Sequence, residues 1–175
     1  MSRVVFAAAA AAALAGCIST SAVREENLEE RTNIELGALR ARHPTLAPIL
    51  RDSFAFAVFP SVGETQMGTG GAYGHGVLYV HGLPAGFVAM HQPASGLDLR
   101  GRTYAEVLVL RDQDHVEKLK AGHLDLVDAP IVFLRSGREV STAGIPGTVA
   151  LIELRSGPRL PVSVAGQQIV YEPRG

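Results

Sequence analysis

The sequence predicts an α+β fold: a curved antiparallel β-sheet or partly closed barrel, with N-terminal helices and one further helix packed on it. Residues 23–42 are rich in Glu, Leu, Arg and Ala, which favours a helix. Short apolar segments separated by Gly and Pro follow, which is typical of antiparallel strands. Small residues alternate from Gly68 to Gly76. One face of that strand would therefore be nearly bare, which permits close backbone approach or sharp curvature.

The composition is typical of a single globular domain. The chain has 175 residues, of which 47% are hydrophobic and 19% are charged, so one core is expected and general disorder is not. The formal charge of −1 argues against nucleic-acid binding, which requires a surplus of Lys and Arg. The single cysteine excludes an internal disulfide and a cysteine-rich zinc site.

Residues 1–16 are predicted to be a signal peptide. Arg3 precedes an apolar run over residues 4–14, which is too short to span a bilayer. The sequence Leu14-Ala15-Gly16-Cys17 resembles the lipobox of bacterial lipoproteins. That resemblance implies cleavage before Cys17, a diacylglyceryl thioether on its sulfur, and a freed amine that accepts a further acyl chain such as palmitate. The alternative is an ordinary secretory signal with an incidental cysteine.

The residue after Cys17 indicates where the anchored protein resides. It is Ile18 rather than Asp, which in the sorting of Gram-negative lipoproteins implies the outer membrane. We therefore predict a membrane partner through acylated Cys17, with the protein facing the periplasm. Residues 17–38 would form the lipidated N-terminus, a tether and a helix, and residues 39–175 the main domain.

The remaining elements follow in order along the chain. Pro44 ends the first helix, because proline lacks the N–H and clashes with the preceding turn. A short helix over residues 45–52 comes next, and a strand over residues 54–59 is stopped by Pro60. Further strands are predicted at residues 77–80, 85–91, 97–101, 104–110, 131–134, 149–154, 160–164 and 168–171.

A third helix is predicted over residues 112–121. Asp112 or Asp114 can cap its start, and Gly122 can end it. Its apolar residues, Val116 and Leu119, are three apart and would face the core.

Glu106 interrupts an otherwise apolar strand. Alternation along residues 104–110 favours an outward Glu106 on a half-exposed strand, sharing a face with Tyr104 and Leu108. The alternative interpretation is a buried acid. Either way, a single acid without a partner does not indicate acid–base catalysis.

The motifs of enzymes and cofactor sites are incomplete, so a non-catalytic protein without cofactor or metal is predicted. Tyr73 stands where a dinucleotide motif requires its third Gly. Phe59 stands two residues before Ser61, where a nucleophile elbow requires Gly. The six histidines form no two-histidine helix motif. An envelope hydrolase would need a nucleophile and a base that only the fold brings together.

Three segments, in order and spacing, resemble the SYLF family, which is also described as an actin-regulator domain. They are residues 55–60, 70–78 and 95–107, and residues 162–166 are similar to the family's C-terminal strand motif. The resemblance covers about residues 39–170 and assigns residues 39–175 to a SYLF-like domain. The residues of its motifs, to which we give a structural role, are Phe59, Pro60, Gly70, Gly71, Tyr73, Gly74, Gly76, Gly96 and Glu106.

The resemblance implies a phospholipid-binding module, and bacterial members are often lipoproteins. Candidate head-group contacts are Arg100, Arg102, Lys118 and Lys120, because cationic groups suit phosphate. The alternative interpretation is that these are ordinary solvated charges. The predicted function is a lipid-anchored, periplasmic, lipid-binding envelope lipoprotein. The alternative function is a structural or protein-interaction lipoprotein for envelope integrity.

Overall fold

Three helices and seven strands make up the part of the chain that the structure describes. This computed structural model describes residues 20–64, 71–92, 103–156 and 166–174. The helices are α1 (Thr20–Arg42), α2 (Leu46–Arg51) and α3 (Gln113–Lys120). The strands are β1 (Ala55–Glu64), β2 (Ala72–Val80), β3 (Leu83–Gln92), β4 (Thr103–Leu110), β5 (Ile131–Phe133), β6 (Thr148–Ser156) and β7 (Gln168–Pro173).

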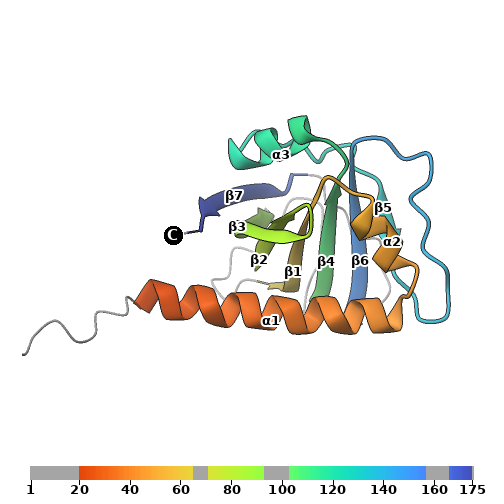
Figure 1. Cartoon of the computed structure of the whole chain (residues 1–175), viewed down its shortest axis with the longest axis horizontal. Helices are drawn as coiled ribbons and strands as arrows, with labels where there is room; N and C mark the ends of the chain where they lie inside the picture. Colours follow the sequence, from red (N-terminus) through yellow and green to blue (C-terminus); the bar gives the residue numbers. More distant parts are fainter. Residues whose placement is uncertain (1–19, 65–70, 93–102, 157–165, 175) are drawn as a thin grey trace, which may run out of the picture.

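The strands form one sheet in the order β5-β6-β4-β1-β2-β3-β7 (Figure 1). The α+β prediction is therefore confirmed, and the sheet is not closed into a barrel because β5 and β7 do not pair. Five strand pairs are antiparallel, but β5 and β6 are parallel. The expectation of a wholly antiparallel sheet is wrong at this edge. A parallel pair needs a long connection, which residues 134–147 provide.

Helix α1 packs on one face of the sheet, which we call the outer face. Its Leu36 and Leu39 join the apolar cluster of that face, with Leu39 fully buried. The helix ends at Arg42, two residues before Pro44, as predicted. It runs without interruption across the predicted boundary between residues 38 and 39. The outer-face cluster includes Phe56, Val58, Val77, Tyr79, Val107 and Leu151.

Helix α3 packs on the opposite face, which we call the inner face; α1 and α3 lie on opposite sides of the sheet in Figure 1. Val116 and Leu119 are the buried residues of α3, as predicted. Asp112 is its cap, because its carboxylate accepts a 3.0 Å hydrogen bond from the backbone N–H of His115. The inner-face cluster includes Phe59, Leu78, Met90, Leu108 and Ile152.

Strand β1 continues through Pro60 to Glu64, so the prediction that Pro60 stops it is wrong. The register with β2 shifts between Val58 and Ser61, and the register with β4 shifts between Phe59 and Val62. A bulge leaves residues outside the ladder. Pro60 has no N–H to donate, and this bulge lets a central strand include it.

The bare face of β2 is the inner face, and the bulge of β1 lies against it. A Cβ added at Gly76 would come within 2.1 Å of the Val58 carbonyl oxygen, and one at Gly74 within 2.9 Å of Val62 Cγ2. Real Cβ atoms do not approach so closely, so Gly76 is required by contact with the backbone of β1 and Gly74 by contact with the Val62 side chain. The predicted close approach is confirmed, and the neighbouring backbone belongs to β1.

Several predictions fall on residues outside the described ranges. They concern Cys17, Gly70, Gly96, Arg100, Arg102 and the strands at residues 97–101 and 160–164. Among the helices of the described residues, none is both long and apolar enough to span a bilayer.

Candidate functional site

The described part of the predicted head-group site lies on α3. Lys118 Nζ forms a 2.6 Å ion pair with Asp114. Lys120 Nζ lies 5.4 Å from the centroid of the Tyr171 ring, in cation–π geometry. Because α3 also begins with the acidic residues Asp112 and Asp114, its basic end is not an isolated cationic surface.

One group of potential metal ligands lies at the start of α3. Asp112, Asp114 and His115 have ligand atoms within 4.8 Å of one another, which no other such group does among the described residues. Each has a structural role: Asp112 caps the helix and accepts from His115 Nδ1 at 2.6 Å, and Asp114 pairs with Lys118. The arrangement is explained by helix capping and by an i,i+4 ion pair.

A mixed basic and apolar surface covers the part of the outer face next to the start of α1. Strand register places His75 opposite Ala89, which lies opposite Val170. It also places Tyr73 opposite His91. Tyr73 is 40% and Val170 is 60% exposed, so α1 leaves these rows uncovered. We call Tyr73, His75, His91 and Val170, together with Arg24 and Arg31 of α1, the basic flank.

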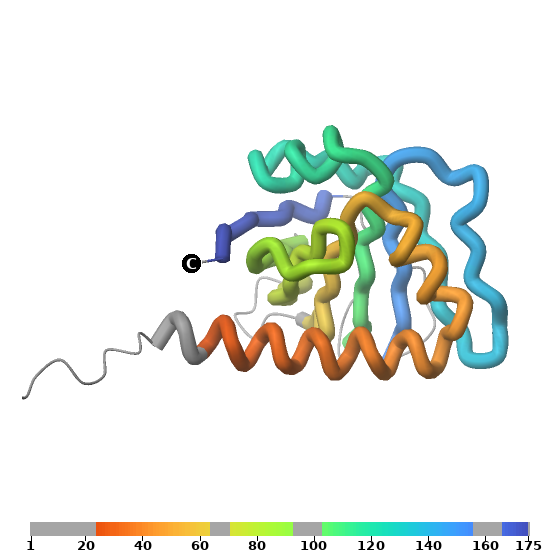
Figure 2. The backbone as a smooth tube through the Cα atoms, viewed as in Figure 1, coloured from red at the N-terminus to blue at the C-terminus, as the bar shows by residue number. Residues whose placement is uncertain are grey.

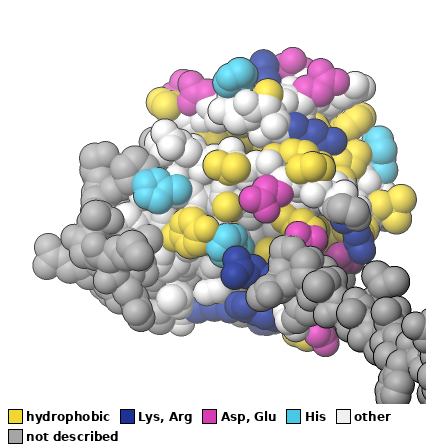
Figure 3. All heavy atoms as spheres, turned by 90° about the vertical axis from the view of Figure 1, so that its left-hand side faces the viewer, with side chains coloured by type: hydrophobic (Ala, Val, Ile, Leu, Met, Phe, Trp, Pro, Cys, Tyr) yellow, Lys and Arg dark blue, Asp and Glu magenta, His cyan; other side chains and the backbone are white. Residues whose placement is uncertain are grey.

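The two arginines give the basic flank its charge. Arg24 and Arg31 are exposed, and within the described ranges neither forms an ion pair. Burial lowers the pKa of His75, the positive charges of Arg24 and Arg31 lower it further, and Glu172 opposes them. Histidine, hydrophobic and basic side chains adjoin one another on the side of the molecule turned to the viewer in Figure 3.

The basic flank lies near the start of the described chain. The described start of α1 and the end of β7 lie on the same side of the molecule (Figure 2). Thr20, where α1 begins, is three residues after Cys17 in the sequence. The described surface near the predicted lipid attachment thus includes Arg24 of the basic flank, while Glu25 and Glu26 follow it directly in α1.

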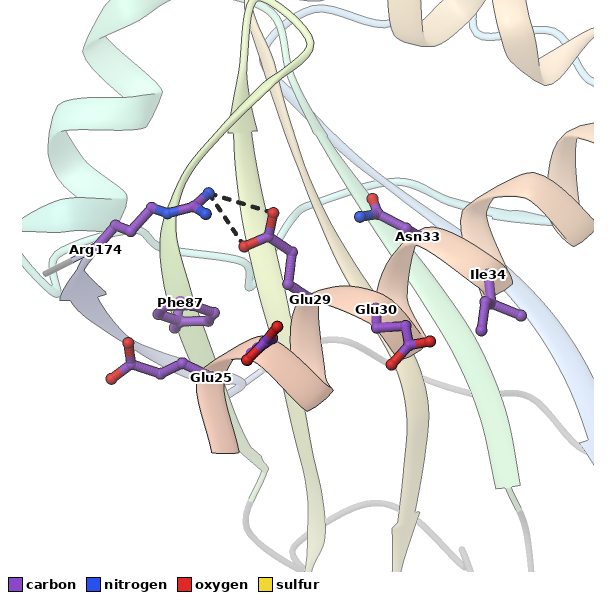
Figure 4. Close-up of a pocket in the computed structure, with 8 residues that line it drawn as sticks. Glu25, Glu29, Glu30, Asn33, Ile34, Phe87 and Arg174 are labelled. Carbon is purple, nitrogen blue, oxygen red and sulfur yellow. Dashed lines mark hydrogen bonds and ion pairs between the residues drawn. The ribbon is translucent and has the colours of Figure 1, made fainter. Parts of the chain in front are cut away.

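An acidic groove lies on the other side of α1. It has a volume of about 600 Å³, and four glutamates of α1 contribute to its lining, with Asn33, Ile34, Phe87 and Arg174. Arg174 Nη1 lies 3.1 Å from Glu29 Oε2, and the two side chains point toward one another across the groove (Figure 4). Glu25, Glu26 and Glu30 form no ion pair with any described residue, so the groove keeps a net negative charge.

A buried polar cluster lies on the inner face, and its centre is Glu106. The side chain is fully buried, so the prediction of an outward, half-exposed Glu106 is wrong. Alternation does hold, because Tyr104 and Leu108 share its face. The prediction was wrong about solvent exposure, because α1 and α3 cover the two faces of the sheet. Residues 104–110 themselves could have indicated this burial. Apart from Glu106, the side chains on both faces of this strand are apolar, as in strands that are buried on both faces.

The partners of Glu106 are amides. Gln167 Nε2 donates to Glu106 Oε2 at 3.0 Å and lies 3.4 Å from Gln92 Oε1. Burial raises the pKa of the Glu106 carboxyl to about 7, and the hydrogen bond from Gln167 opposes this only in part. Burial, followed by the negative charge of Glu106, raises the pKa of Tyr104. At neutral pH Glu106 therefore exists in both protonation states.

The comparisons with known proteins found no matching family model and no matching curated protein. The resemblance to the SYLF family stays a prediction, based on the motifs of the sequence.

Proposed function

We propose that the chain is a lipid-anchored, non-catalytic envelope lipoprotein that binds phospholipid through the basic flank, attached to the outer membrane and facing the periplasm. The observation that supports it most is the position of the basic flank beside the start of α1, three residues after Cys17. Three residues of extended chain reach at most about 11 Å. Acylation of Cys17 would therefore hold this side of the domain against the bilayer.

The chemistry of the basic flank suits a phospholipid surface. Guanidinium groups bind phosphate through two parallel hydrogen bonds, and Arg24 and Arg31 form no ion pair with a carboxylate of any described residue. Tyrosine is favoured at membrane interfaces because it has an apolar ring and a polar tip. Tyr73 and Val170 would enter the interface while the arginines contact head groups. Such binding complements the acyl chains of Cys17, which supply the anchor.

The proposal includes a curved sheet and a SYLF-like domain. Gln167, next to the edge strand β7, touches Glu106 of β4, although three strands lie between β7 and β4 in the sheet. Strand twist and a β1 bulge favour such a curl. The absence of catalysis is proposed from the incomplete motifs.

Vesicle flotation tests the lipid-binding part. A chain that begins at position 17 and carries Cys17→Ser should float with vesicles that contain anionic phosphatidylglycerol, and less with vesicles of phosphatidylcholine alone. Binding should weaken as salt rises, because exposed charges are screened. A chain that floats with neither vesicle would reject phospholipid binding. Intact mass of the full-length protein tests acylation of Cys17 separately.

The acidic groove favours a second candidate, a protein-interaction lipoprotein for envelope integrity. Three of its glutamates form no ion pair with a described residue, and Phe87 lies between the groove and the sheet; this lining fits a basic partner segment through charge complementarity. Crosslinking in the envelope distinguishes the two functions. One stoichiometric protein crosslinked at Ile34, with no vesicle binding by the domain, would favour this candidate over the first.

A further inference from the structure

The contact between Gln167 and Glu106 joins distant parts of the sheet. Gln167 directly precedes β7, an edge strand that pairs only with β3. Its amide reaches Glu106 on β4 at 3.0 Å and passes Gln92 at the end of β3. The start of β7 is therefore fastened over the inner face by side chains as well as by its backbone ladder.

The hydrogen-bonding capacity of this cluster fits a neutral acid better than a carboxylate. Glu106 Oε1, Gln167 Oε1 and Tyr104 Oη are buried without a hydrogen-bond partner. Two of these three atoms are acceptors that lack a donor. A carboxylate only accepts hydrogen bonds, and a stable buried one usually accepts two or three. Tyr104 Oη brings one O–H donor, and a protonated Glu106 supplies a second one, so that both unpartnered acceptor oxygens could be satisfied.

Among the described residues, no positively charged side chain is placed to stabilise the ionised form of Glu106. The residues opposite Glu106 on the neighbouring strands are Phe59 of β1 and Ile152 of β6. Gln92 and Gln167 approach it from β3 and from the start of β7. Tyr104 is the titratable group with which Glu106 interacts electrostatically among the described residues. It stays neutral, because burial and the charge of Glu106 both raise its pKa.

We propose that Glu106 is a proton-dependent latch: as a buried neutral acid it allows the start of β7 to close over the inner face, and loss of its proton to water favours opening, because the desolvation cost of the buried carboxylate exceeds the strengthening of its hydrogen bond with Gln167. The ionised carboxylate is unfavourable while it is buried without water, because it loses its hydration. Moving Gln167 and β7 would admit water, because β7 is the edge strand of the sheet and among the described strands it pairs with β3 alone, although Lys120 of α3 also contacts its Tyr171. This inference does not depend on the proposed phospholipid binding.

Linkage fixes the direction of the effect. The pKa of Glu106 is raised to about 7 in the closed form, whereas a hydrated Glu titrates near 4.3. The closed form therefore binds more protons in the intervening range. Its stability falls as the pH rises from about 4.5 to about 7 and levels off above that. The opening equilibrium of β7 should increase by at least ten-fold between about pH 5 and pH 7.

Hydrogen exchange of the full-length protein tests the latch. After correction for the intrinsic rate, protection of β7 amides should fall by about ten-fold or more from pH 5 to pH 7, while β1 amides change less. In Glu106→Gln, which is isosteric and uncharged, β7 protection should stay within about two-fold over this range. The control Glu172→Gln removes an exposed carboxyl from β7 itself and should keep the fall of the natural protein.

Two results would overturn the latch. One is equal pH dependence in the natural protein and in Glu106→Gln. The other, which needs no folded variant, is a ¹³C NMR titration of the natural protein in which every Glu carboxyl has a midpoint below about pH 5. The latch requires one resonance with a midpoint near pH 7, and its disappearance in Glu106→Gln assigns it.

Discussion

The two faces of the sheet use their charges in opposite ways. On the outer face, charges flank α1 at or near the surface: they include the basic flank and the acidic groove, and ion pairs join the end of α1 to β6. On the inner face of the sheet, Glu106 is fully buried and has amide partners. Surface charges interact weakly through water, whereas burial favours the neutral form of an acid. The outer face is therefore suited to recognition, and the inner face to coupling protonation with folding.

The largest expected effect tests how tightly the inner face is built. Gly76→Ala should destabilise the fold by roughly 3 kcal/mol or more, because the added Cβ would lie 2.1 Å from the Val58 carbonyl oxygen, which requires backbone shifts. Thermal unfolding followed by circular dichroism measures it. The outer-face control is Gly37→Ala in α1, where nothing lies within 4 Å. That change should stabilise by up to about 1 kcal/mol. A similar loss of stability in Gly76→Ala and Gly37→Ala would contradict the proposed difference between the two faces.

The next effect concerns the buried acid. At pH 8 Glu106→Gln should increase the free energy of unfolding by at most about 4 kcal/mol, because it removes the cost of ionising a carboxyl whose pKa is about 7 in the fold. Near pH 4.5 the gain should vanish, since Glu106 is then protonated in the folded state. Urea unfolding at the two pH values measures the difference. A variant that is less stable than the natural protein at pH 8 would be the contrary result.

The third effect compares the two sides of α1. The double variant Arg24→Gln, Arg31→Gln should weaken binding to phosphatidylglycerol vesicles by about 2 kcal/mol, or roughly 30-fold, because each basic residue near an anionic surface contributes about 1 kcal/mol. The matched variant Glu26→Gln, Glu30→Gln changes two charges on the acidic side and should bind equally or more tightly. Vesicle co-sedimentation at constant salt gives both affinities. If both double variants bound the vesicles equally weakly, the two sides of α1 would not differ in lipid binding.

The smallest effect is expected in the acidic groove. Arg174→Ala breaks the ion pair with Glu29, whose side chains are 48% and 21% exposed. Exposed ion pairs contribute at most about 1 kcal/mol, so the unfolding free energy should change by less than that. Chemical denaturation measures it. A loss of several kcal/mol would mean that the chain end is part of the core.

Local features of the fold could be predicted from the sequence, and long-range ones could not. The cap at Asp112 and the end of α1 before Pro44 depend on neighbouring residues, and both are confirmed. The continuation of β1 through Pro60 depends on a bulge between strands, which no local pattern specifies. The burial of Glu106 depends on α1 and α3 covering both faces of the sheet, which is a property of the assembled fold.

The basic flank could not be predicted from local sequence either. Arg24, His75 and His91 lie on α1, β2 and β3, and only the strand register and the crossing of α1 bring them to one side. Lys118 and Lys120, by contrast, are recognisable as a pair because they are two residues apart in one helix. That spacing does not reveal the ion pair of Lys118 with Asp114 or the contact of Lys120 with Tyr171.

The central claim is that the lipid anchor presents the basic flank, and not the acidic groove, to the bilayer. Cys17 is the only cysteine and acylation consumes its thiol, so one introduced cysteine can carry a fluorophore in the full-length lipidated protein. Tyr73→Cys and Ile34→Cys place the probe at exposed positions on the two sides. In vesicles with spin-labelled phospholipid, we expect strong quenching at position 73 and little at position 34. Equal quenching at both, or stronger quenching at position 34, would contradict the claim.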